Sequence, residues 1–128
     1  MKEVLFTESA PKPIGPYSQA VRVGNLVFCS GQIAIDPAVG DVVHEGNVER
    51  QTEVVMENVR AVLEKAAGLT LNHVVKTTIF LKSMDDFPKV NAIYGRYFEG
   101  DPPARSTVEV SRLPKNVLVE IEVIASVS

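Results

Sequence analysis

Alternating apolar and polar residues near the C-terminus predict two β-strands, over residues 105–110 and 117–125. Successive side chains of a strand point to opposite faces, so Arg105 and Thr107 share one face of the first strand. On the second strand, Glu120 opposes a face that is entirely apolar. We expect Arg105 and Glu120 to lie on adjacent strands, both on faces turned away from the core.

Three further segments have the composition of strands. Residues 3–7 form a short candidate, and residues 73–81 are rich in β-branched and aromatic side chains. Residues 17–35 predict a hairpin, because two strand-like runs flank a Gly-Asn pair at 24–25 that tolerates positive φ. The prolines of segment 10–16 exclude regular structure and predict a loop.

Helical periodicity replaces the alternation in two segments. Between residues 47 and 67 apolar residues recur every three or four positions, the other face is charged, and Gly68 stands where a C-cap glycine belongs. Residues 87–98 carry a second apolar helix face, preceded by Ser83 as a candidate capping residue. Asn91 lies on that apolar face, so its amide needs hydrogen-bond partners.

The resulting order β, ββ, α, β, α, β, β predicts a single α+β domain over residues 1–128, a two-layer sandwich of about six strands and two helices. Two helices can cover only one face of such a sheet. The other face is expected to carry large apolar side chains, which favours self-association. These side chains are Leu26, Phe28, Phe80, Leu118 and Ile124.

Composition narrows the class of protein. Thirteen basic and sixteen acidic residues give a net charge of −3, which disfavours nucleic-acid binding. No apolar run approaches the length of a membrane span, and the N-terminus has no signal-peptide pattern. The one cysteine excludes an intrachain disulfide, and the two histidines lack metal-ligand spacing. We expect a cytoplasmic protein without a metal, a membrane or a nucleic-acid partner.

Arg105 and Glu120 are the candidate functional groups. A charged group at a subunit interface is tolerated when it is paired, or when water or a ligand reaches it. Pro102 and Pro103 make the approach to Arg105 rigid, and a guanidinium is shaped to hold a carboxylate through two parallel hydrogen bonds. A structural salt bridge from Arg105 to a glutamate is the alternative. The possible partners are Glu109, Glu120 and Glu122.

Other polar residues admit two interpretations each. Tyr17 is a catalytic candidate or a core residue with a satisfied hydroxyl, and Ser30 with Gly31 marks a turn, a close backbone approach or a ligand contact. Cys29, within an apolar strand, is expected to be a buried small side chain rather than a nucleophile. The common nucleotide-binding, protease and hydrolase motifs are absent. The residues alone thus predict an oligomeric α+β domain with an arginine able to hold an anion.

Four stretches resemble one family. These are IGPYSQAV (14–21), FCSGQI (28–33), VKTTIFLKSMDDFPKVNAIYGRYF (75–98) and PARSTVEVSRLPKNVLVEIEVIA (103–125). They are similar to the RidA/YjgF family of reactive intermediate (enamine/imine) deaminases, and the similarity extends over essentially the whole chain. It implies a chorismate-mutase-like subunit that forms a homotrimer with a central barrel, outer helices and sites in clefts between subunits. It also implies hydrolysis of 2-aminoacrylate and 2-iminopropanoate-type intermediates to 2-oxo acids and ammonia, with no metal or cofactor.

The resemblance also implies roles for individual residues. Arg105 would hold the substrate carboxylate, Glu120 would hold or activate the attacking water, and Tyr17 would enclose the substrate and join the proton relay. Three further positions match the lining of the family cleft: Ser30, Gly31 and Asn91. Many bacterial members read PARSC, whereas Thr107 stands here at the cysteine position and adds a hydroxyl to the pocket.

Two other functions stay open at this stage. The same cleft could bind 2-oxo acids or other small carboxylates without turnover, because a carboxylate clamp serves both roles. RNA cleavage or translation inhibition is also attributed to members of the family. The acidic net charge of −3 and the lack of a basic, aromatic groove oppose that activity.

Overall fold

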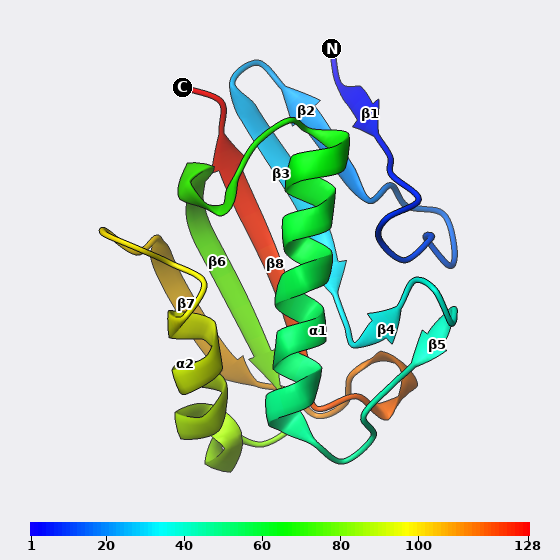
Figure 1. Ribbon diagram of the computed structural model, residues 1–128, viewed down its shortest axis with the longest axis vertical. Helices are drawn as coiled ribbons and strands as arrows, with labels where there is room; N and C mark the ends of the chain where they lie inside the picture. Colours follow the sequence, from blue (N-terminus) through cyan, green and yellow to red (C-terminus); the bar gives the residue numbers. More distant parts are fainter.

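Six strands form one mixed sheet in the order β1-β2-β3-β8-β6-β7 in the computed structural model, which describes residues 1–128 (Figure 1). All neighbouring strands are antiparallel except β6 and β7, which are parallel. The strands are β1 (Glu3–Leu5), β2 (Ala20–Val23), β3 (Leu26–Gln32), β6 (Val74–Leu81), β7 (Ala104–Glu109) and β8 (Val119–Ser126). A separate two-stranded hairpin follows β3 and consists of β4 (Ile35–Asp36) and β5 (Asp41–Val42).

Helix α1 (Val48–Ala61) begins and ends where its sequence signals lie. The side chain of Asn47 caps the helix by accepting a hydrogen bond from the backbone N–H of Arg50 at 3.0 Å. The last turn widens into a π-helical turn over Val62–Ala66. Gly68 then takes a φ of +68°, the left-handed conformation that a C-cap glycine supplies.

Helix α2 (Phe87–Gly95) is shorter than the predicted segment 87–98. Arg96 and Tyr97 donate their N–H groups to carbonyls three residues back, at 3.1 Å each, so the helix tightens and ends before Phe98. The side chain of Ser83 accepts a hydrogen bond from the N–H of Asp85, which starts the short 3-10 turn that leads into α2.

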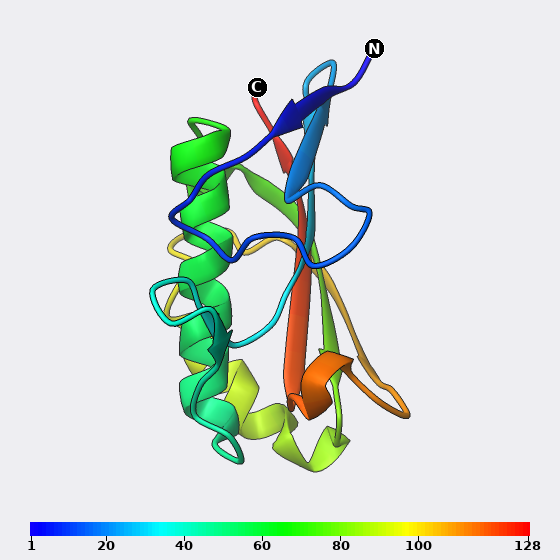
Figure 2. The same ribbon diagram turned by 90° about the vertical axis from the view of Figure 1, so that its right-hand side faces the viewer.

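Both helices pack on one face of the sheet, and Figure 2 shows the sheet edge-on with no α-helix on its other side. The core between the two layers includes Val55 and Met56 of α1 and Ile79 and Ile121 of the sheet, all fully buried. On the open face Phe28 is 40 % exposed, and the other four predicted side chains are exposed or half-buried. The prediction of an open apolar face is confirmed.

The predicted relation between Arg105 and Glu120 is wrong. Strand β6 lies between β7 and β8, so the two residues are not on adjacent strands. Arg105 pairs with Thr77, which faces the helices, whereas Glu120 pairs with Phe80 on the open face. Parallel strands require a crossover connection, and α2 provides it by taking the chain from β6 to β7 at the sheet edge. Alternation within each strand could not reveal this pairing.

Candidate functional site

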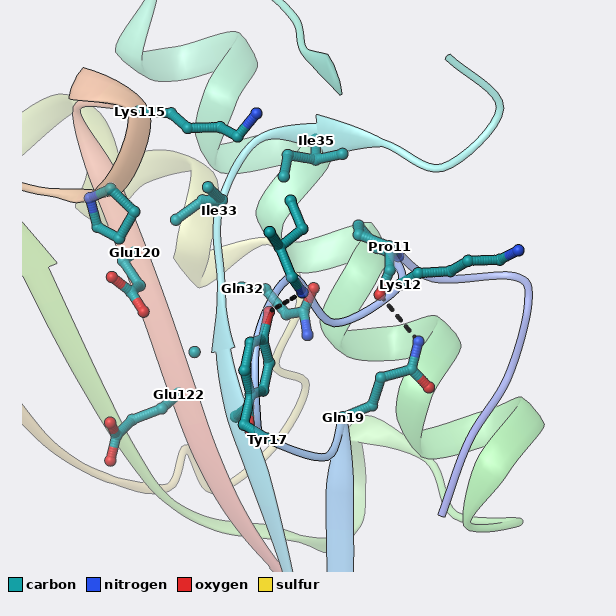
Figure 3. A pocket seen from close by; sticks show the side chains of 14 residues that line it. Pro11, Lys12, Tyr17, Gln19, Gln32, Ile33, Ile35, Lys115, Glu120 and Glu122 are labelled. Carbon is teal, nitrogen blue, oxygen red and sulfur yellow. Dashed lines mark hydrogen bonds between the residues drawn. The ribbon is translucent and has the colours of Figure 1, made fainter. Parts of the chain in front are cut away.

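A pocket of about 630 Å³ lies where the loop after β1, the end of β3 and the start of β8 meet (Figure 3). Four of the predicted site residues line it: Tyr17, Ser30, Gly31 and Glu120. Glu120 and Glu122 extend from β8 along one wall, while Lys12 and Gln19 lie toward the opposite wall. The pocket thus combines carboxylates, a phenol and backbone groups with apolar walls.

Gln19 fixes the loop that forms one side of this pocket. Its side chain is only 2 % exposed. The amide oxygen accepts a hydrogen bond from the N–H of Thr7 at 2.7 Å, and the amide NH₂ donates to the carbonyls of Thr7 and Pro11, at 2.9 Å each. The prolines leave this loop without a regular ladder of backbone hydrogen bonds. The buried side-chain amide of Gln19 therefore satisfies backbone groups of the loop that have no backbone partner.

Tyr17 projects from the same loop and is 52 % exposed, so the interpretation of Tyr17 as a core residue is wrong. Its hydroxyl oxygen accepts a hydrogen bond from the N–H of Ile14 at 3.3 Å, which orients the ring beside the pocket (Figure 3). The hydroxyl proton stays available to a ligand or to water.

Ser30 and Gly31 occupy an irregularity in β3, where the register with β8 shifts between Cys29 and Gln32. The hydroxyl of Ser30 donates to the carbonyl of Ser18 at 2.6 Å. A Cβ on Gly31 would lie 2.9 Å from the carboxyl carbon of Glu120 and would overlap its oxygen. Gly31 is therefore a close approach that leaves room for the Glu120 carboxylate.

Glu120 is the most perturbed carboxylate of the chain. Burial raises its pKa above the ordinary value, and the nearby negative charge of Glu122 adds to the rise. None of the ion pairs of the structure involves Glu120. Its half-buried carboxylate therefore faces the pocket and can accept a proton from water or from a ligand.

The other predicted residues form a second group beside α2. Arg105 donates from Nη1 to the side-chain oxygen of Asn91 at 2.6 Å. Asn91 itself is exposed, because the buried face of α2 is formed by Val90, Ile93 and Tyr94, so the prediction of a buried amide on the apolar face is wrong. The guanidinium lies over the rings of Phe87 and Tyr94, 5.3 and 5.1 Å from their centroids. No carboxylate forms an ion pair with Arg105, so the salt-bridge alternative is excluded within the chain.

Glu109, one of the three possible partners of Arg105, is used elsewhere. Its carboxylate accepts a hydrogen bond from the N–H of Met84 at 2.8 Å.

Thr107 follows Arg105 on the same face of β7, and its hydroxyl is the one buried side-chain polar atom without a hydrogen-bond partner. Such groups are rare in folded proteins, because an unpaired buried hydroxyl costs about 1–3 kcal/mol.

The structure thus divides the predicted site into two groups. Tyr17, Ser30, Gly31 and Glu120 share the pocket. Arg105, Asn91 and Thr107 belong to the helix-facing side of the sheet edge. A single chain does not bring Arg105 and Glu120 together.

Two buried side-chain amides of α1 have structural roles that were not predicted from the sequence. Gln51 accepts a hydrogen bond from the N–H of Leu118 at 2.9 Å, two residues before Glu120. Asn58 donates to the carbonyl of Ile35 at 2.8 Å and holds the chain beyond β3. Their signal was present in the sequence, because both amides interrupt the apolar face of a helix, where a polar group needs a specific partner.

Metal and thiol chemistry have no support in the geometry. No group of three or more histidine, cysteine or acidic side chains is arranged to hold a metal ion. The Cys29 side chain is buried, as its apolar strand predicted, and burial raises the pKa of its thiol to about 12. No helix of the structure has the length and apolarity needed to cross a membrane.

The pocket on this two-layer α+β sandwich is large enough to hold a small molecule. The family model described as endoribonuclease L-PSP matches residues 7–127. A RutC family protein of Pyrococcus horikoshii is 59 % identical over 125 residues, 98 % of each chain. Reactive Intermediate Deaminase A, chloroplastic, of Arabidopsis thaliana is 50 % identical over 125 residues, 98 % of this chain and 66 % of that protein.

A solved structure also has the same fold as this chain. The crystal structure of E. coli TdcF with bound serine matches with a TM-score of 0.92 at 40 % identity, over 98 % of this chain and 99 % of the other. The chain therefore belongs to the RidA/YjgF family, as its four sequence motifs indicated.

Proposed function

We propose that this protein is a hydrolytic deaminase of 2-aminoacrylate and 2-iminopropanoate-type intermediates, which it converts to 2-oxo acids and ammonia. One observation carries the proposal: Glu120 and Arg105 are both free of ion pairs, although each is partly buried. A free carboxylate suits proton transfer, and a free guanidinium suits a carboxylate ligand. The relative from Arabidopsis named as a reactive intermediate deaminase supports the same reaction class.

The site requires more than one copy of the chain, because Arg105 and Glu120 face opposite sides of the sheet. We propose a homotrimer in which the open faces pack into a central barrel and bury the exposed ring of Phe28. In this assembly Arg105 of one subunit and Glu120 of another line the same intersubunit cleft. Thr107 lies beside Arg105, so its hydroxyl, which is unpaired within the chain, gains a bound ligand as a partner.

The substrate would be oriented before it reacts. The guanidinium of Arg105 holds the carboxylate through two parallel hydrogen bonds, while Asn91 fixes one side of the guanidinium. An enamine substrate first takes a proton at its methylene carbon and loses one from nitrogen, which gives the imine. Tyr17, with a hydroxyl beside the pocket, serves the proton relay and encloses the ligand.

Hydrolysis then proceeds at an electrophilic carbon. Glu120 accepts a proton from water while the water oxygen bonds to the imine carbon, and the C=N electron pair moves to nitrogen, which takes up the proton held by Glu120. In the carbinolamine the Glu120 carboxylate then accepts the hydroxyl proton and passes it to the amine nitrogen. The oxygen lone pair forms the C=O bond, the C–N bond breaks, and ammonia leaves with the electron pair of that bond. Burial of Glu120 favours this role, because a raised pKa makes the carboxylate a stronger base.

The test generates 2-aminoacrylate from serine with a dehydratase and measures release of the 2-oxo acid with and without this protein. We expect clear acceleration by the wild-type protein, loss of acceleration in Arg105→Ala, and no change in Arg112→Ala, which removes an exposed arginine of the loop before β8. A rate equal to that in buffer, or an undiminished rate in Arg105→Ala, would overturn the proposal.

A second candidate is a non-catalytic module that binds small carboxylates. The crystal structure of TdcF with bound serine favours it, since serine is a small carboxylate held by a protein of the same fold. Calorimetric binding of 2-oxobutanoate together with no deamination of any imine would support this function over the first. Ribonuclease activity, suggested by the description of the family model, is tested on the same preparation with Arg105→Ala as the contamination control.

A further inference from the structure

Arg105 is a long, flexible side chain on an edge strand, and few protein groups hold it. Its guanidinium donates one hydrogen bond, to Asn91. Its remaining support is aromatic, because the rings of Phe87 and Tyr94 lie 5.3 and 5.1 Å from the guanidinium carbon. A flexible cation binds a carboxylate more tightly when it is already oriented, because less conformational entropy is lost on binding.

Tyr94 differs from Phe87 in being fixed at its far end. Its side chain is 4 % exposed, and its hydroxyl shares a hydrogen bond of 2.8 Å with the hydroxyl of Thr77. Thr77 is completely buried in β6 and is the direct register partner of Arg105 in β7. Thr77 therefore contacts Arg105 in two ways: directly through the pairing of β6 with β7, and indirectly through the ring of Tyr94.

Helix α2 presents two supports for the guanidinium at once. Asn91 and Tyr94 are three residues apart and therefore lie on the same helix face. Asn91 supplies an acceptor at the edge of the planar group, and Tyr94 supplies a ring face. An acceptor and a ring together define the orientation of the plane, which neither group defines alone.

We propose that Tyr94, anchored by Thr77, is a positioning residue that holds the Arg105 guanidinium ready for a substrate carboxylate without touching the substrate. The inference deepens the proposed function and rests on it for the effect on turnover, whereas its effect on carboxylate binding stands separately. Burial also raises the pKa of Tyr94, although the hydrogen bond with Thr77 and the charge of Arg105 both act to lower it, so the hydroxyl stays protonated at neutral pH.

The variants remove the anchor and keep the packing. Thr77→Val removes the hydroxyl that bonds to Tyr94, whereas Thr77→Ser keeps a hydroxyl at this position. Tyr94→Phe keeps the aromatic ring and removes the hydroxyl that anchors it. Tyr97→Phe is the matched control, because Tyr97 also lies 5.1 Å from an arginine, Arg60 on the outer side of α1. Melting temperatures confirm that each variant folds, and the Thr77 pair decides the question if Tyr94→Phe does not fold.

The measurements are the Kd of 2-oxobutanoate by calorimetry and the kcat and KM for imine hydrolysis. Loss of one buried hydrogen bond in Thr77→Val or Tyr94→Phe is expected to raise Kd and KM about threefold to tenfold and to change kcat less than about twofold. Thr77→Ser and Tyr97→Phe are expected to stay within about twofold of the wild type. In an Arg105→Lys background, which has no planar guanidinium on the ring, Tyr94→Phe is expected to leave kcat/KM unchanged.

The outcomes separate this inference from the proposed function. An unchanged Kd in both Thr77→Val and Tyr94→Phe, or an equal loss from Tyr94→Phe in the Arg105→Lys background, overturns the positioning role. Normal binding with no turnover by the wild-type protein overturns only the deaminase proposal. Absence of 2-oxobutanoate binding by the wild-type protein overturns the positioning role together with the carboxylate-holding role of Arg105.

Discussion

Replacing Gly31 with alanine is expected to remove most of the activity and to leave the fold intact. Gly31 does not have a positive φ, so its backbone accepts alanine without strain. The new methyl carbon would lie 2.9 Å from the carboxyl carbon of Glu120. Unbonded carbon atoms lie about 3.5 Å apart or more. The carboxyl carbon must therefore retreat by about 0.6 Å, the difference between about 3.5 Å and the 2.9 Å separation, and its oxygen must move further.

The cost in stability is small, because the obstacle is the far end of a flexible side chain. Turning Glu120 away from its preferred rotamer costs about 0.5–1.5 kcal/mol. The cost in rate is larger, because a displacement of about 1 Å in a catalytic group lowers the rate about 100-fold. We expect a melting temperature within a few degrees of the wild type and about 1 % of its kcat for imine hydrolysis.

The assay compares kcat and melting temperature for Gly31→Ala with those for Gly95→Ala. Gly95 also lacks a positive φ and has no heavy atom within 4 Å of the added Cβ, so it isolates the effect of the substitution itself. In a Glu120→Ala background, Gly31→Ala is expected to have no further effect on kcat. Wild-type kcat in Gly31→Ala, or a further loss in the Glu120→Ala background, would refute the steric link between Gly31 and Glu120.

Three further outcomes are expected. In the proposed mechanism Glu120 acts as an ionised base, so kcat is expected to fall as the pH drops through a pKa above the ordinary 4.5. Glu122→Gln should move this limb of the pH–rate profile to lower pH, and an unmoved limb would exclude the influence of Glu122. Thr107→Val removes a buried hydroxyl that is unpaired within the chain, so urea denaturation is expected to show an unfolding free energy that is unchanged or higher by about 1 kcal/mol. An unfolding free energy lower by more than about 1 kcal/mol would reveal a partner for that hydroxyl. Phe28→Glu places a charge on the open sheet face, so light scattering is expected to show smaller particles than for the wild type. The control Val39→Glu, in the exposed turn between β4 and β5, is expected to leave the particle size unchanged. An unchanged particle size in both variants would show that the interface lies on another face.

The elements of the fold follow closely from local patterns. The alternation over 117–125 and the helical spacing over 47–67 produced a strand and a helix at nearly those positions, because each pattern matches one backbone geometry. The end of α2 was misplaced by three residues, since Tyr97 and Phe98 continue the apolar periodicity after the backbone has tightened. Periodicity reports which side chains can be buried and is insensitive to that change in hydrogen bonding.

The candidate site was predicted less completely. Tyr17, Ser30, Gly31 and Glu120 share one pocket, although the sequence carries no periodic signal that joins a proline-rich loop to strands β3 and β8. The placement of Arg105 on the face of Glu120 failed, because alternation within a strand leaves open which of its two faces meets the helices.

Local residue order was therefore enough to establish the α+β class, the two helices and the apolar open face of the sheet, since these depend on side-chain period and composition within short segments. The insertion of β8 between β3 and β6, the contact of Gly31 with Glu120 and the separation of Arg105 from that carboxylate arise from pairing between distant segments. Such pairing depends on the packing of the whole chain, because each strand could bond with several neighbours and the burial of both helices on one face selects among them.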